Sequence, residues 1–222
     1  MKKTFSVIIA VLIGASVIPL TADAASFSAT SYGSVYVSNA TWATARGASS
    51  GTSRTNPGYA QGVWNGSAYF IERGFLVFNT SALGAGCTVA SAYITLTGAA
   101  ILNNGTNLET YNIYSSTGGT TVSGSDYNKA GSAAFSTAIA QTSLAASGNF
   151  TWNLNSSGLA QINKTGNTFF SVREATYDVA NNPGVNTAYW GFNTPTLNVT
   201  CGSKRKIITV SFNVKPEPFI YA

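Results

Sequence analysis

Histidine is absent from the whole chain, and charged residues make up only 9% of it, against a usual share of about 25%. Without histidine the chain lacks the general base of Ser-His-Asp and Cys-His catalysis and the commonest metal ligand. Hydrolytic chemistry would have to come from carboxylates, and the sequence holds only seven acidic residues. We therefore expect a non-catalytic protein without a cofactor, whose surface is hydrated through hydroxyl and amide groups rather than ions.

Long apolar runs are missing except at the N-terminus. There Lys2 and Lys3 precede an apolar run that extends from Phe5 to Leu20, and Ala22-Asp23-Ala24 follows. A basic start, a short apolar run and a small-x-small site form the pattern of a secretory signal peptide. A retained membrane anchor is the alternative, but no cluster of charges that would stop transfer follows the run. We expect residues 1–24 to be removed, and the mature protein to be secreted or held at the cell surface without crossing the membrane.

Cysteine occurs only twice, at Cys87 and Cys201. Two cysteines in an exported protein most simply predict one disulfide bond. Two buried free thiols are the alternative, because exported proteins do not always meet an oxidising environment.

Helical periodicity is nearly absent after residue 24. Short runs rich in Val, Ile, Thr, Tyr and Phe recur instead between clusters of Gly, Asn, Ser and Pro, which predicts an all-β fold. One short helix is expected over residues 156–163, with Asn155 or Ser156 as its cap. Residues 47–66 are expected to form a long loop. The expected strands cover residues 34–38, 68–79, 91–97, 108–115, 149–154, 168–173, 188–192, 196–200 and 206–214.

Alternation of apolar and polar residues predicts which side chains face the core. Phe150, Trp152 and Leu154 alternate with polar residues and are expected to be buried. In the last expected strand the apolar positions are Ile208, Val210, Phe212 and Val214. We expect a single domain over residues 25–214, followed by a C-terminal tail over residues 215–222.

Three segments, in this order along the chain, resemble a known family. Residues 73–83 (RGFLVFNTSAL) resemble the R-x-x-L-x-F-D-L-S-x-L strand of DNRLRE-type domains, which are related to the carbohydrate-binding modules of secreted bacterial and archaeal proteins. Residues 87–96 (CTVASAYITL) are similar to the strand that follows it in that family. Residues 157–162 and 169–173, with Asp178-Val179, are similar to its short helix, strand and acidic loop. The resemblance implies a jelly-roll-like β-sandwich, although Asn79 stands where the family often has Asp. A sandwich of this kind can serve as a sugar binder, an adhesin or a spacer.

The acidic residues offer little for catalysis or metal binding. Glu72 and Glu174 each adjoin an arginine, so alternation places the two charges on opposite faces of a strand, and we expect surface charge or ion pairs there. Asp178 with Asn181 and Asn182 could provide oxygen ligands for a structural Ca²⁺, or simply form an Asx-rich turn. Whether a metal is bound therefore stays open.

Aromatic residues are the better candidates for ligand contacts, because a sugar ring can stack its apolar C–H face on an aromatic ring. The candidates are those with loop-like or strand-edge contexts and polar neighbours, namely Trp42, Tyr59, Trp64 and Tyr127. The alternative is that these rings cover the edge of the sandwich. Nucleic acid is not an expected partner, because the only run of basic residues is Lys204-Arg205-Lys206.

The sequence thus favours a secreted, non-catalytic β-sandwich that binds a polysaccharide or surface glycan. A structural or adhesive subunit of a cell-surface layer or extracellular filament is the second hypothesis, in which the partners are copies of the chain itself. Low charge and many Ser, Thr, Asn and Gly residues suit such packing, and an apolar Phe219-Ile220-Tyr221 tip could add to the sheet edge of a neighbour.

Overall fold

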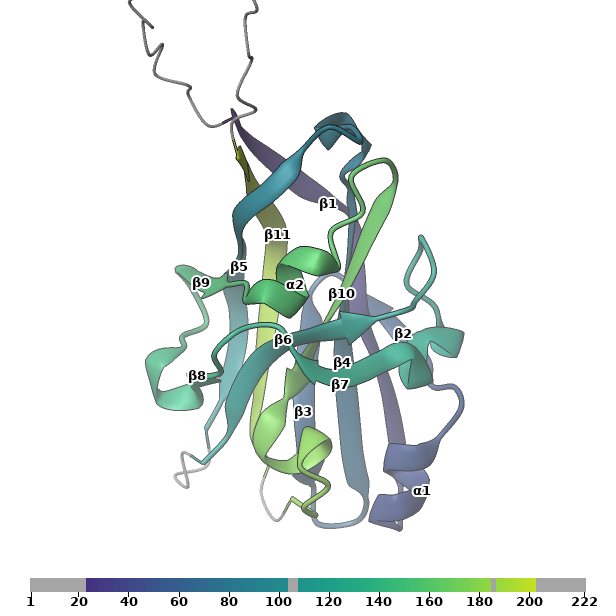
Figure 1. Cartoon of the computed structure of the whole chain (residues 1–222). Helices are drawn as coiled ribbons and strands as arrows, with labels where there is room; N and C mark the ends of the chain where they lie inside the picture. The colour runs from purple at the N-terminus through teal and green to yellow at the C-terminus, as the bar shows by residue number, and fades with distance from the viewer. Residues whose placement is uncertain (1–22, 104–107, 185–186, 203–222) are drawn as a thin grey trace, which may run out of the picture. The chain divides into compact units, whose positions relative to one another are not determined.

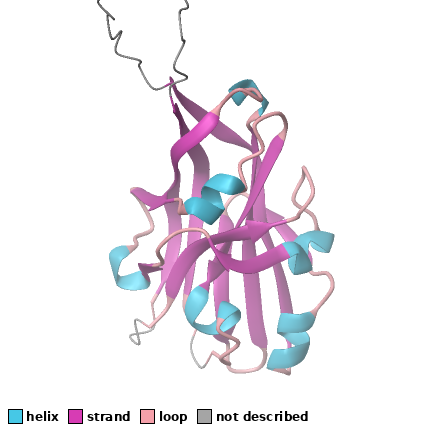
Figure 2. Cartoon of the chain, viewed as in Figure 1, coloured by secondary structure: helices cyan, strands magenta, loops and turns pink. Residues whose placement is uncertain are grey.

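The computed structural model describes residues 23–103, 108–184 and 187–202, and strands dominate these ranges (Figures 1 and 2). Every pair of neighbouring strands is antiparallel. The strands are β1 (Asp23–Asn39), β2 (Thr52–Thr55), β3 (Gly58–Trp64), β4 (Tyr69–Asn79), β5 (Thr88–Leu102), β6 (Thr110–Ser116), β7 (Ala130–Ala134), β8 (Ile139–Ala140), β9 (Asn149–Asn153), β10 (Asn167–Glu174) and β11 (Tyr189–Gly202). The expected all-β sandwich is confirmed.

The strands form two layers that share β1. Residues 23–28 of β1 pair with β11, which also pairs with β5, and β5 pairs with β9; these strands make the first layer. The later part of β1 pairs with β2 and β4, and β4 leads through β10 to β6 in the second layer. Strand β3 joins the layers, because it pairs with both β11 and β4.

The main hydrophobic core lies between the layers. Strands of the first layer contribute Ile94, Leu96, Leu197 and Trp190, and strands of the second contribute Leu76, Phe78, Phe170 and Ile113. Trp152 and Leu154 belong to this core and Phe150 packs against it, as the alternation predicted. Burying an aromatic or branched apolar side chain stabilises the fold by about 1.5–3 kcal/mol.

A second hydrophobic cluster packs on the opposite side of β4, where Ile71 and Phe75 alternate with the residues that face the main core. It includes Trp42 and Ala45 of helix α1 (Trp42–Gly47) and Tyr127 of the 3-10 turn η2 (Gly124–Lys129). Short helical segments therefore cover this face of the sheet, which Figure 2 shows as cyan ribbons beside the magenta strands.

Several boundaries differ from the expectations. The two strands expected at 188–192 and 196–200 form one strand, β11, whose pairing with β5 shifts register between Asn193 and Thr196. The loop expected at 47–66 contains β2 and β3, and α1 is a second helix that the pattern did not indicate. The predicted short helix is present as α2 (Ser156–Ala160), and the Asn155 side chain caps it by accepting a hydrogen bond from Gly158 N at 3.0 Å.

The disulfide prediction is confirmed. Cys87 and Cys201 are bonded across 114 residues of sequence, and their bond ties the loop before β5 to the end of β11. No helix in the described ranges is long and apolar enough to cross a membrane. The predicted signal peptide up to residue 22, the expected strand 206–214 and the C-terminal tail lie outside the described residues.

Candidate functional site

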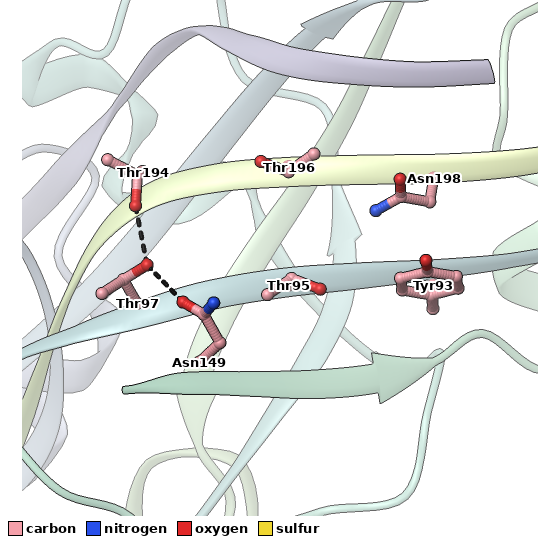
Figure 3. Close-up of a pocket in the computed structure, with 7 residues that line it drawn as sticks. All are labelled: Tyr93, Thr95, Thr97, Asn149, Thr194, Thr196 and Asn198. Atoms are coloured by element: carbon pink, nitrogen blue, oxygen red, sulfur yellow. Dashed lines mark hydrogen bonds between the residues drawn. The ribbon is translucent and has the colours of Figure 1, made fainter. Parts of the chain in front are cut away.

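A row of neutral polar side chains covers the solvent side of β5, β9 and β11. We call this surface the hydroxyl face, and Figure 3 shows it from outside the sheet. It forms an open groove of about 340 Å³. Its lining residues come from β5 (Tyr93, Thr95 and Thr97), β9 (Asn149) and β11 (Thr194, Thr196 and Asn198).

The period of two along each strand creates this face. In β5, Ile94 and Leu96 are fully buried in the core, so Tyr93, Thr95 and Thr97 point to the other side. Strand β11 repeats the arrangement, with Leu197 and Val199 inward. A polar surface on one side of an antiparallel sheet and an apolar core on the other is the usual arrangement when one face meets water.

Strand register lines the polar residues up in rows across the sheet. Asn198 of β11 lies opposite Tyr93 of β5, and Tyr93 lies opposite Asn153 of β9. The next row places Thr196 opposite Thr95. Neighbouring strands lie about 4.8 Å apart and alternate residues about 6.7 Å apart, so the face presents hydroxyl and amide groups at regular intervals.

Hydrogen bonds fix one end of the groove. Thr194 Oγ1 donates to Thr97 Oγ1 at 2.8 Å, and Thr97 Oγ1 donates to Asn149 Oδ1, also at 2.8 Å (Figure 3). This chain joins three strands and leaves the Asn149 amide N–H groups, which point away from Thr97, for other acceptors.

Tyr93 gives the face its one large ring, and 42% of the residue is exposed. The other large hydrophobic residues with comparable exposure in the described ranges are Leu102 and Leu108, which are not aromatic. The lining contains no carboxylate and no basic group. The groove therefore suits a neutral ligand that offers both an apolar surface and hydroxyl groups.

Two of the four aromatic candidates are buried. Tyr127 is fully buried in the second cluster, where its hydroxyl donates to Ala45 O at 2.8 Å and the Arg73 guanidinium lies 4.3 Å from the ring centre. Trp42 is also buried, and its indole N–H donates to Asn181 Oδ1 at 3.0 Å. Both rings pack against other residues of the chain and offer no face to a ligand.

Tyr59 and Trp64 are half-buried in β3, and neither lines the groove of the hydroxyl face. The Arg54 guanidinium lies 5.2 Å from the Tyr59 ring centre, and Tyr189 meets that ring edge-on at 5.7 Å. Trp64 contacts Tyr69, with 4.8 Å between the ring centres. Each ring thus keeps only part of its surface for a partner.

The carboxylates beside arginines are buried, which corrects the expectation of surface charge. Glu72 accepts hydrogen bonds from Ser34 Oγ at 2.6 Å and Gln61 Nε2 at 2.7 Å, and Arg54 approaches it to 3.7 Å. Burial raises the pKa of the Glu72 carboxyl above its usual value, although these hydrogen bonds and Arg54 oppose the shift. The expected ion pairing is present, but inside the fold.

Asp178 is unsuited to the calcium site considered for it. Arg73 and Arg173 both bind its carboxylate, with closest N–O distances of 2.7 Å. The two guanidinium groups hold the pKa of Asp178 below its usual value despite burial. Asn181 has a positive φ of 56° and accepts the Trp42 hydrogen bond, so an Asx-rich turn describes this segment.

Tyr93 lies within a strand, so a loop context does not single it out as a candidate. The signal was present as an alternation of Tyr93, Thr95 and Thr97 with apolar residues, which marks one polar face of a strand. What the pattern could not supply was the pairing of β5 with β11, more than ninety positions later in the sequence.

No family model matches the chain, and no curated protein matches it.

Proposed function

We propose that the chain is a secreted, non-catalytic module that binds a neutral polysaccharide or surface glycan on the hydroxyl face. The observation that carries the proposal is the exposed ring of Tyr93, surrounded by uncharged hydroxyl and amide groups on three neighbouring strands. The ligand surface is thus the sheet itself and not the loop aromatics considered first.

A sugar ring matches the two kinds of group on this face. Its C–H face is apolar enough to lie on an aromatic ring, and its hydroxyl groups can both donate to and accept from Thr hydroxyls and Asn amides. The regular rows allow several sugars of a polymer to make equivalent contacts. A charged ligand would find no counter-charge in the groove lining.

Secretion is proposed from two independent features. The first is the signal-peptide pattern of the N-terminal sequence, and the second is the Cys87–Cys201 disulfide, a bond that persists mainly in oxidising compartments. The resemblance to DNRLRE-type domains supports the same proposal, because those domains belong to secreted proteins.

A non-catalytic role is supported by where the described carboxylates lie. A glycosidase needs two carboxyl groups about 5–10 Å apart on either side of the scissile bond, and the hydroxyl face has neither. Asp178 is held by two arginines, and Asp126 caps the turn η2 by accepting from Ser123 N at 2.8 Å. These acids stabilise the fold away from the groove.

The alternative, a structural or adhesive subunit, rests on the low charge, the many Ser, Thr, Asn and Gly residues, and the apolar tip Phe219-Ile220-Tyr221. That tip lies outside the described residues, so none of the described contacts favours self-assembly over ligand binding. Light scattering of the mature protein, with and without residues 215–222, separates the two. The module we propose is a monomer in both forms.

The direct experiment is a binding screen of the mature protein against a glycan array and a panel of neutral polysaccharides. We expect binding to at least one neutral glycan, with an affinity that changes little between 50 mM and 500 mM NaCl because no charges line the groove. Absence of binding to every neutral glycan, or strong loss of binding with salt, would refute the proposal.

A further inference from the structure

Glu109 is a fully buried carboxylate that makes no hydrogen bond within the described structure. Both of its carboxylate oxygens lack a partner, although the residue has no exposed surface. The ion pairs of the described ranges connect arginines to Asp178 or Glu72, and none of them involves Glu109. A buried, unpaired carboxylate is costly, so proteins usually pair it, protonate it or bind it to a metal.

Two more buried side-chain oxygens in the described ranges have no hydrogen-bond partner, namely Tyr111 Oη and Gln141 Oε1. Glu109 immediately precedes β6, and Tyr111 is the second residue of that strand. The Gln141 backbone N–H donates to Glu109 O at 2.9 Å, which continues the pairing of β6 with β8. The orphaned oxygens therefore belong to one small region.

The Gln141 amide has a defined orientation. Its Nε2 donates to Leu102 O at 2.7 Å and to Tyr189 O at 3.4 Å, and only the nitrogen end can donate to two carbonyl groups. Its oxygen is therefore the free end of the amide. An oxygen acceptor held in this way is preorganised for a donor or a cation.

A second buried carboxyl group lies on the neighbouring strand. Glu174 lies opposite Tyr111 in the pairing of β10 with β6, and it caps the following turn by accepting from the backbone N–H groups of Thr176, Tyr177 and Asp178. These hydrogen bonds occupy Glu174, whereas the Glu109 oxygens have no such partner.

We propose that Glu109 and Gln141 bind one divalent metal cation, with Ca²⁺ the best fit, through the Glu109 carboxylate and the Gln141 side-chain carbonyl. The site is separate from the hydroxyl face, because neither Glu109 nor Gln141 lines its groove.

The donor atoms select the class of cation. All are oxygens, and carboxylate and amide carbonyl oxygens are the ligands that Ca²⁺ takes in flexible geometry, with water completing its coordination. Zn²⁺ and copper favour imidazole or thiolate, but the chain has no histidine and both cysteines are in the disulfide. The cation would join β6 to the segment that contains Gln141 and stabilise both.

The test compares the mature protein with its Glu109→Gln variant, using Ca²⁺ itself as the probe. Equilibrium dialysis should give one bound Ca²⁺ per wild-type chain, and thermal melts should show a rise of several degrees from EDTA to millimolar Ca²⁺. Glu109→Gln should lose both effects. In EDTA it should melt no lower than the wild type, because the Glu109 side chain makes no hydrogen bond that the substitution could remove.

Glu72→Gln is the matched control, because it replaces a buried carboxylate that has hydrogen-bond partners. It should keep the Ca²⁺-dependent rise. No Ca²⁺ bound to the wild type at millimolar concentration would overturn the proposal, and this measurement does not depend on any variant folding. Retention of the rise in Glu109→Gln, or its loss in Glu72→Gln, would also overturn it.

Discussion

Arg73 binds Asp178 through two hydrogen bonds, from Nε to Oδ2 at 2.9 Å and from Nη2 to Oδ1 at 2.7 Å, across 105 positions of the sequence. Arg173 donates to the same carboxylate from Nε at 2.8 Å. The carboxylate thus joins β4 to β10 and to the turn that follows β10. The guanidinium groups also donate to backbone carbonyls, including Tyr127 O and Gly131 O, so this buried network connects both strands with η2 and β7.

Asp178→Asn should destabilise the protein by about 3–5 kcal/mol, because it leaves two buried guanidinium groups without a counter-charge. Denaturant unfolding followed by tryptophan fluorescence measures the change. Asp126→Asn is the control. Because Asp126 only caps a short turn, this variant should lose about 1 kcal/mol of its free energy of unfolding. Equal losses in the two variants would show that the arginine network contributes no more than an ordinary cap.

The disulfide should contribute about 4–5 kcal/mol by restricting the unfolded chain, since it closes a loop of 114 residues. A Cys87→Ala, Cys201→Ala double variant should therefore melt many degrees lower and remain β-rich. Scanning calorimetry of the two proteins in the same buffer gives the difference. A variant that melts within a degree of the wild type would contradict this entropic contribution.

Stability should depend on pH through Glu72. Because burial raises its pKa in the folded protein, the folded state binds a proton more tightly than the unfolded chain does. Its stabilising contribution is complete below the ordinary carboxyl pKa and is lost as pH rises through the folded value. The free energy of unfolding of the wild type should therefore fall relative to Glu72→Gln between pH 4 and pH 7. A difference in free energy of unfolding between the two proteins that stays constant across this range would contradict the raised pKa of Glu72.

Truncation of Tyr127 should cost much more stability than truncation of Tyr93. Tyr127→Ala should cost about 3–5 kcal/mol, because it empties a buried site and removes the hydrogen bond to Ala45. Tyr93→Ala should change stability by about 1 kcal/mol or less, because Tyr93 lies on the surface with 42% of the residue exposed. Urea unfolding of both variants tests the assignment of one ring to the core and the other to the surface.

Some of the fold follows directly from local chemistry. The alternation at Phe150, Trp152 and Leu154 predicted their burial, and Asn155 has the side chain that a helix cap requires. The disulfide followed from a count of two cysteines. These features depend on neighbouring residues or on a single possible partner, and a sequence contains both kinds of information.

Other features depend on distant neighbours and were missed. Strand β3 looked like a loop because of its glycines, yet a Cβ on Gly58 would lie 2.5 Å from Phe192 Cζ, so the core ring requires glycine there. Strand β2 has no apolar alternation, since it is an edge strand with every residue exposed. The burial of Arg73 was equally hidden, because its counter-charge is 105 residues away.

The proposed site keeps the kind of contact expected from the sequence, a sugar stacked on an exposed aromatic ring, but uses other residues. Loop context did not predict the burial of Trp42 and Tyr127. Helix α1 and the turn η2 fold both rings into the second cluster. Only the strand register reveals that Tyr93 stands among threonines and asparagines of other strands.

The most direct test of the account is affinity electrophoresis of the mature wild type, Tyr93→Ala and Trp64→Ala in gels containing the neutral polysaccharide that binds best in the screen. Loss of a stacking ring should weaken binding by about tenfold or more in Tyr93→Ala. Trp64→Ala, with its ring away from the hydroxyl face, should bind as the wild type does. Unchanged binding by a folded Tyr93→Ala protein would contradict the assignment of the ligand to this face.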